Sequence, residues 1–220
     1  MPAHLQAVLF DLDGTLVDSA PDLAGTANDM LSMRGRPALP YEALRCHAGS
    51  GARGMLGAAF GMTPNAPGYG ELRDEFHTLY AARLLRQTRC FEATQRMLGA
   101  LDERRIVWGI VTNKALRFAE PLVQALGLAR SAALVAGDST PHTKPHPAPL
   151  LEAAKRLAVP PAACVYVGDD ERDVIAGSAA GMRTLAAAWG YLGAGHDPHT
   201  WGADAVLPDA DALLQWLELA

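Results

Sequence analysis

Residues 7–16 read AVLFDLDGTL, a short apolar run that ends in two aspartates and a glycine. Such a run predicts a buried strand of a parallel sheet, and open α/β sheets carry their chemistry at the carboxyl ends of these strands. Residues two apart in an extended chain point to the same side, so we expect Asp11 and Asp13 to face one site. Two carboxylates so close together repel, which predicts a divalent cation between them or a proton on one. The plainer interpretation is a strand followed by an aspartate-rich turn.

The composition excludes several classes of protein. The chain has 220 residues, half of them hydrophobic, which suits one α/β domain with a small insertion. A formal net charge of −5 and scattered basic residues predict no nucleic-acid partner and no binding to a membrane surface. We expect no signal peptide or membrane anchor, because no apolar run approaches about 18 residues. Three separated cysteines without a CxxC pair favour reduced thiols and a cytoplasmic location. A monomer and a homodimer both remain open.

The pattern after the first strand is helical. Residues 17–87 have the spacing of amphipathic helices and no convincing strand alternation, so we expect a helical domain inserted there. Ser19 is expected to cap its first helix, with Pro21 in the first turn.

Strands and helices alternate from residue 93 onward. Expected strands are 106–111, 132–136, 164–167, 184–188 and 205–207, with helices between and after them. Strands joined by helices predict a mostly parallel sheet with helices on both faces. We therefore expect a Rossmann-like α/β core of residues 1–16 and 88–220 and a small α-helical cap of residues 17–87.

Polar residues follow three of the expected strands. Besides the two aspartates, Thr112 ends the strand at 106–111, and Asp169 and Asp173 follow the strand at 164–167. Lys144 precedes a further helix. A metal ion and an ammonium group can neutralise phosphate oxygens while a hydroxyl group orients them, so that a carboxylate can attack phosphorus. Taken singly, each residue has a plain explanation as a helix cap, a solvated lysine or a first-turn acid.

In this order the motifs resemble those of the haloacid dehalogenase-like superfamily of aspartate-nucleophile phosphohydrolases, over essentially the whole chain. The resemblance implies that Asp11 is the nucleophile and forms an aspartyl-phosphate. Asp13 would protonate the leaving group and then activate water. Thr112, Asn113 and Lys144 would bind the phosphate.

The resemblance also implies a Mg²⁺ site. Its ligands would be Asp11, the backbone carbonyl of Asp13, and Asp169, with Asp173 bound directly or through water. Asp170 stands where many relatives carry serine, and its role is left open.

The expected helical domain matches the small cap that this superfamily inserts after its first motif. A lid over the site excludes water and favours small phosphorylated metabolites as substrates. Within it, Arg53 is the candidate for binding a substrate carboxylate, and Ser50 and His47 are weaker candidates for specificity. A solvated helix residue is the plain alternative for Arg53.

Two groups within the superfamily are similar to this sequence. The triplet TNK at 112–114 and the turn WGY at 189–191 resemble phosphoglycolate phosphatases. The resemblance to bacterial N-acetylmuramic acid 6-phosphate phosphatases is closer, through the segments VTNK at 111–114, RFAEP at 117–121, GDD at 168–170 and WGAD at 201–204. These segments lie mainly in the expected core, whereas the cap is expected to select the substrate. Both 2-phosphoglycolate and N-acetylmuramic acid 6-phosphate therefore stay open as substrates.

Alternatives from other classes are weighed against the same residues. A β-phosphoglucomutase-like phosphotransferase would use the same nucleophile and remains the main alternative. A dehalogenase needs no general acid, so Asp13 disfavours it. A catalytically silent binding protein is expected to have lost a motif residue, and none is missing.

Overall fold

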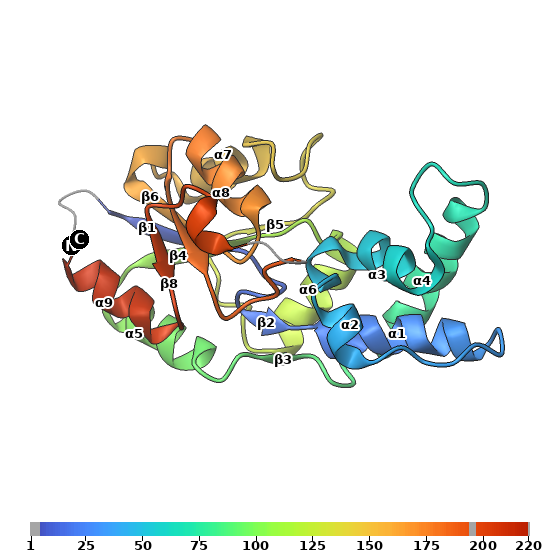
Figure 1. The fold of residues 1–220 in the computed structure, drawn as a ribbon. Coiled ribbons are helices and arrows are strands. Elements are labelled where there is room, and N and C mark those ends of the chain that lie inside the picture. The colour runs from blue at the N-terminus through green and yellow to red at the C-terminus, as the bar shows by residue number, and fades with distance from the viewer. Residues whose placement is uncertain (1–4, 194–196, 220) are drawn as a thin grey trace.

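The computed structural model describes residues 5–193 and 197–219. In Figure 1 the sheet and most of its covering helices lie at the left, and a separate group of helices lies at the right. The six-stranded sheet has the order β5-β4-β1-β6-β7-β8, and all neighbouring strands are parallel. Its strands are β1 (Ala7–Phe10), β4 (Val107–Val111), β5 (Leu134–Val135), β6 (Cys164–Gly168), β7 (Arg183–Ala187) and β8 (Ala205–Leu207). The parallel α/β fold expected from the sequence is confirmed.

Helices cover both faces of this sheet. The covering helices are α5 (Thr94–Glu103), α6 (Leu116–Ala125), α7 (Ala148–Leu157), α8 (Glu171–Ala179) and α9 (Asp211–Leu219). Strand β1 is buried along its whole length, and its side chains alternate between two apolar clusters. Val8 and Phe10 pack with α5 and α9, whereas Ala7 and Leu9 pack with α7 and α8. Burial on both faces explains why the strand is apolar throughout.

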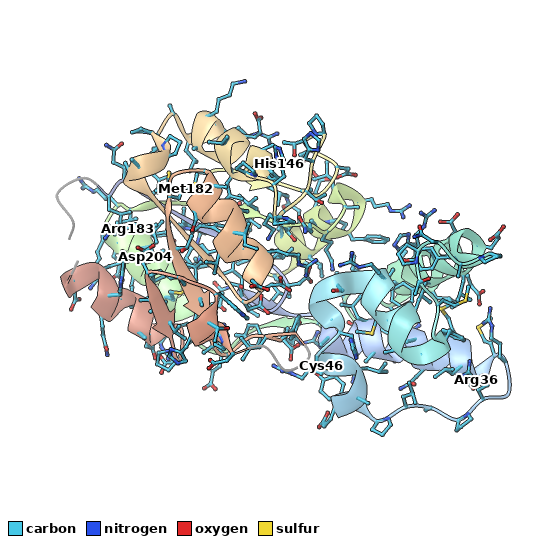
Figure 2. All side chains as sticks on the ribbon, turned by 45° about the horizontal axis from the view of Figure 1, so that its top comes forward. Arg36, Cys46, His146, Met182, Arg183 and Asp204 are labelled. Atoms are coloured by element: carbon cyan, nitrogen blue, oxygen red, sulfur yellow. The ribbon has the colours of Figure 1, made fainter. Side chains whose placement is uncertain are left out.

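The remaining helices form the inserted group. They are α1 (Ala20–Ser32), α2 (Tyr41–Arg45), α3 (Gly51–Phe60) and α4 (Tyr69–Arg83), with a 3-10 turn at Ala48–Ser50. They share an apolar cluster of their own, which Phe118 and Leu122 of α6 extend into the sheet part. In Figure 2, Arg36 lies at the far end of this group and Cys46 at the end nearer the sheet. The division into a core of residues 1–16 and 88–220 and a cap of 17–87 stays a prediction.

Two short strands connect the parts. Strand β2 (Val17–Asp18) pairs antiparallel with β3 (Arg89–Cys90), so the two connections of the inserted helices lie side by side (Figure 1). Strands of two residues give no periodic pattern, which is why the sequence did not predict them. None of the described helices is both long and apolar enough to cross a membrane.

One expected contact was wrong. Ser19 does precede α1, but its side chain makes no capping hydrogen bond. The backbone of Ser19 is helical, with φ −101° and ψ −3°, and not in the extended region that capping residues usually adopt. Its hydroxyl donates to Asp13 Oδ1 at 2.5 Å. Ser19 therefore belongs to the surroundings of Asp13.

Candidate active site

Neighbouring strands bring three carboxylates together. Strand β1 pairs with β6, and the Asp11 backbone N–H donates to the Val167 carbonyl at 2.9 Å. Asp11 and Asp169 therefore leave the sheet at the same edge, and Asp173 follows on the first turn of α8. One oxygen atom from each of Asp11, Asp169 and Asp173 lies within 4.8 Å of the others. The structure thus brings three of the predicted site residues into one cluster.

Lys144 supplies the positive charge of this cluster. Its ammonium group lies 2.9 Å from Asp11 Oδ1 and 2.7 Å from Asp173 Oδ1, and it donates to the Tyr166 hydroxyl at 2.8 Å. Burial raises the pKa of Asp11 to about 7; Lys144 opposes this shift, and Asp173 adds to it. Burial and the neighbouring carboxylates also raise the pKa of Asp169. One ammonium group does not balance three carboxylates, so the site favours a further cation.

The donor set fits a divalent cation. Hard cations such as Mg²⁺ and Ca²⁺ take carboxylate oxygens as ligands. Asp169 is held by the Thr15 hydroxyl at 3.0 Å and by the Tyr191 backbone N–H at 2.8 Å. Asp173 is more engaged, because its Oδ1 pairs with Lys144 and its Oδ2 accepts from the Asp170 backbone N–H at 3.1 Å. Asp11 also pairs with Lys144, and each of the three carboxylates offers one oxygen atom to a shared cation.

The Asp13 carboxylate points elsewhere. It lies 3.0 and 3.1 Å from Lys114 Nζ and accepts from Ser19, and it does not belong to the three-carboxylate cluster. Burial lowers the pKa of Lys114, but Asp13 and Tyr80 outweigh it and hold that pKa above its usual value. The sequence analysis gave Lys114 no role. Its position two residues after Thr112, on the same side of an extended chain, was the available signal.

Asn113 supports Lys144. Its side-chain oxygen accepts from the Lys144 backbone N–H, and its amide group donates to the Lys144 carbonyl, both at 2.9 Å. The Thr112 hydroxyl accepts from the Lys114 backbone N–H at 3.1 Å. The predicted phosphate-binding residues thus surround one place, and Asn113 additionally fixes the backbone that carries Lys144.

A cavity of about 560 Å³ lies above these residues, between the sheet and the inserted helices. Its floor includes Asp11, Asp13, Thr112 and Lys144. Its walls from the inserted helices combine small residues with aromatic and basic ones; the aromatic and basic residues are Arg53, Tyr69, Arg73, Phe76, His77 and Tyr80.

The residues predicted for specificity lie at different distances from the cavity. Ser50 and Arg53 line the cavity, whereas His47 is not among its described lining residues. Arg53 is exposed and has no ion-pair partner among the residues that the structure describes. The sequence analysis missed Arg73, which also lines the cavity and pairs with Asp74 at 2.8 Å.

Asp170 gains a structural role. It caps α8, accepting from the Arg172 backbone N–H, and its carboxylate pairs with the Arg172 side chain at 2.7 Å. The same guanidinium donates to the Gly49 carbonyl of the inserted group at 2.8 Å. Asp170 thus holds an arginine that connects the sheet part to the inserted helices.

Fold and site together define a class: α/β enzymes with aspartates and a buried lysine gathered at the carboxyl edge of a parallel sheet. The sequence pattern of one family, the haloacid dehalogenase-like hydrolases, matches residues 8–187. The chain belongs to this family.

Relatives with known names narrow the activity. The chain is 44% identical over 205 residues to an N-acetylmuramic acid 6-phosphate phosphatase from Pseudomonas putida, covering 93% of this chain and 92% of that protein. It is 47% identical over 203 residues to a phosphoglycolate phosphatase from Xanthomonas campestris, covering 92% and 91%. The crystal structure of a predicted phosphoglycolate phosphatase from Haemophilus somnus superposes with a TM-score of 0.86 at 25% identity, covering 99% and 100% of the two chains. The protein is therefore a phosphoric monoester hydrolase.

Proposed function

We propose that this hydrolase is a Mg²⁺-dependent phosphatase that cleaves a small phosphate monoester through an aspartyl-phosphate on Asp11. The observation that carries the proposal is the 2.9 Å contact of Asp11 with Lys144 on the floor of the cavity. Lys144 offsets the negative charge that would otherwise keep a phosphate away from Asp11. Asp11, Asp169 and the backbone carbonyl of Asp13 would hold Mg²⁺, and Asp173 would contact it directly or through water. The bound ion would neutralise the phosphoryl oxygens.

The residues of the chain then perform two half-reactions. In the first, Asp11 forms a bond to phosphorus while the bond to the leaving oxygen breaks, and Asp13 gives that oxygen a proton. In the second, Asp13 takes a proton from water, whose oxygen attacks phosphorus and releases Asp11 and inorganic phosphate. Thr112 and Lys144 hold the phosphoryl oxygens throughout, and Asn113 fixes Lys144.

The cavity supports the larger of the two substrates under consideration. Its volume of about 560 Å³ falls within the roughly 300–1,000 Å³ of pockets that enclose drug-sized ligands. Its lining from the inserted helices includes Ser50, Arg53 and Arg73, which offer more donors for the hydroxyl and carboxylate groups of a sugar acid than a two-carbon acid can use. N-acetylmuramic acid 6-phosphate is thus favoured over 2-phosphoglycolate, with Arg53 as the partner of the substrate carboxylate.

Phosphate release from both substrates tests the proposal. Wild-type protein with Mg²⁺ is expected to prefer the sugar phosphate in kcat/KM, and Asp11→Asn to lose turnover by about 10³-fold or more without loss of fold. Asp211→Asn, an exposed aspartate on α9, serves as the matched control. Near-wild-type activity of Asp11→Asn would refute the assignment of Asp11 as the nucleophile. Transfer of the phosphoryl group to a sugar without release of phosphate would favour a phosphotransferase.

A further inference from the structure

Asp13 has a cationic partner of its own. Lys144 contacts Asp11 and Asp173, whereas Lys114 contacts both oxygens of Asp13 at 3.0 and 3.1 Å. The side chains of Lys114 and Asp13 are only 8% and 14% exposed. A buried ion pair is costly to form, so its presence at the proposed acid–base residue calls for an explanation.

Lys114 is fixed from several directions. Its backbone N–H donates to the Thr112 hydroxyl, and its carbonyl accepts from Gly137 at 2.8 Å. Its ammonium group lies 5.0 Å from the centre of the Tyr80 ring, within the range of a cation–π contact. The lysine therefore has little freedom to leave Asp13.

Tyr80 provides a rigid cover. It lies on α4 of the inserted helices, is 2% exposed, and packs against Phe76 and Phe118 at ring-centre distances of 6.1 and 5.3 Å. Its hydroxyl has no hydrogen-bond partner among the described residues. The inserted helices thus reach the acid–base residue through the Tyr80 ring and Lys114.

We propose that Lys114 is a positioning residue for Asp13 in the second half-reaction, where it holds the carboxylate ready to take a proton from the attacking water. Contacts from one ammonium group to both carboxylate oxygens fix the orientation of the Asp13 side chain, and a base must be held within hydrogen-bond reach of the water it activates. Without Lys114, the Ser19 hydroxyl is the remaining described donor to the Asp13 side chain. The inference rests on the proposed phosphatase function.

The test uses a substrate that needs no acid in the first half-reaction. p-Nitrophenyl phosphate has such a leaving group, so the kcat/KM of Lys114→Met is expected to stay within about 3-fold of the wild-type value. The kcat and the KM of this variant are expected to fall together by about 10²-fold. A burst of nitrophenolate near one per enzyme is expected as well, because aspartyl-phosphate accumulates. A fall in kcat/KM equal to the fall in kcat, or a rise in KM alone, would overturn the proposal.

Further variants separate positioning from a loss of fold. In an Asp13→Asn background, Lys114→Met is expected to change kcat by less than about 3-fold, because the lysine acts only through Asp13. An equal loss in both backgrounds would refute the inference. Lys114→Arg, which keeps a charged donor, is expected to retain kcat within about 10-fold of wild type. Lys155→Met, on an exposed face of α7, is the control. Wild-type protein without phosphatase activity would refute the proposed function instead.

Discussion

Glycines determine how closely the chain can approach Asp169. A Cβ atom on Gly14 would lie 2.1 Å from Asp169 Oδ2, and one on Gly190 would lie 2.1 Å from Asp169 Cβ. Gly14 also has a φ of +87°, a conformation that side chains other than glycine rarely adopt. Two glycines distant in sequence therefore form the walls that hold one carboxylate of the acidic cluster.

We predict that Gly190→Ala weakens divalent metal binding. The added methyl group displaces Asp169, and disturbing the surroundings of a metal ligand costs about 10- to 100-fold in affinity. Calorimetric titration with Mg²⁺ measures the change. Gly99→Ala in α5 is the matched control, since its Cβ would meet no atom within 4 Å. An unchanged Mg²⁺ affinity in Gly190→Ala would argue against Asp169 as a ligand.

At the scale of one element, the first turn of α8 contributes residues to the helix cap, to the acidic cluster and to a contact with the inserted helices. Its N-terminal residues form a capping box, in which Asp170 caps the helix and Asp173 accepts from the Asp170 backbone N–H. The same turn supplies Asp173 to the acidic cluster and Arg172 to the contact with Gly49. The start of one helix thus connects the site to the inserted helices.

We predict that Asp170→Ala lowers the free energy of unfolding by about 1–2 kcal/mol, since the helix loses its cap. Asp170→Ser is expected to retain most of this stability, because a serine hydroxyl also caps a helix. Both variants lose the ion pair with Arg172, so their difference isolates the cap. Urea denaturation measures both, and equal losses would contradict the capping role.

At the scale of the whole molecule, several side-chain contacts join the sheet part to the inserted helices. Arg172 donates to Gly49, and Arg45 donates to the Gly190 carbonyl at 3.1 Å. His77 of α4 faces Arg117 of α6, with 3.0 Å between His77 Nδ1 and the guanidinium. Arginine can only donate, so Nδ1 of His77 must accept and carry no proton.

This contact predicts a dependence of stability on pH. Burial, with Arg117 and Arg73 nearby, lowers the pKa of His77 in the folded protein, although Asp74 opposes this. The folded protein therefore favours neutral His77. The contribution of His77 to the free energy of unfolding is full above about pH 6.5 and is lost as the pH falls through the lowered pKa of the folded state. Urea unfolding of wild type and His77→Asn at about pH 7.5 and about pH 5 measures it.

The difference in the free energy of unfolding between wild type and His77→Asn is expected to shrink at the lower pH. Asparagine keeps an acceptor near the position of Nδ1 but does not titrate, so the comparison isolates the proton. An advantage that stays constant or grows on acidification would contradict a neutral His77 in the folded protein.

Much of the fold follows from local pattern. The apolar run before Asp11 and the strand before Asp169 were predicted within a residue or two, because burial on both faces demands continuous apolar residues. The strand expected at 132–136 is shorter, Leu134–Val135, since it lies at the edge of the sheet and pairs only with β4. The pairing of β2 with β3 lay beyond any periodic signal.

The sequence by itself determined which polar residues gather at the candidate site, because strands of a parallel sheet end at one edge and deliver Asp11, Thr112 and Asp169 there. Only the tertiary structure decided how their side chains pair. Lys114 and Asp13 are 101 residues apart, and their contact depends on the spacing of β1 and β4 and on the Tyr80 ring above them. Such pairing depends on distances between strands of the sheet and between the sheet and the inserted helices, and a pattern along the sequence does not contain these distances.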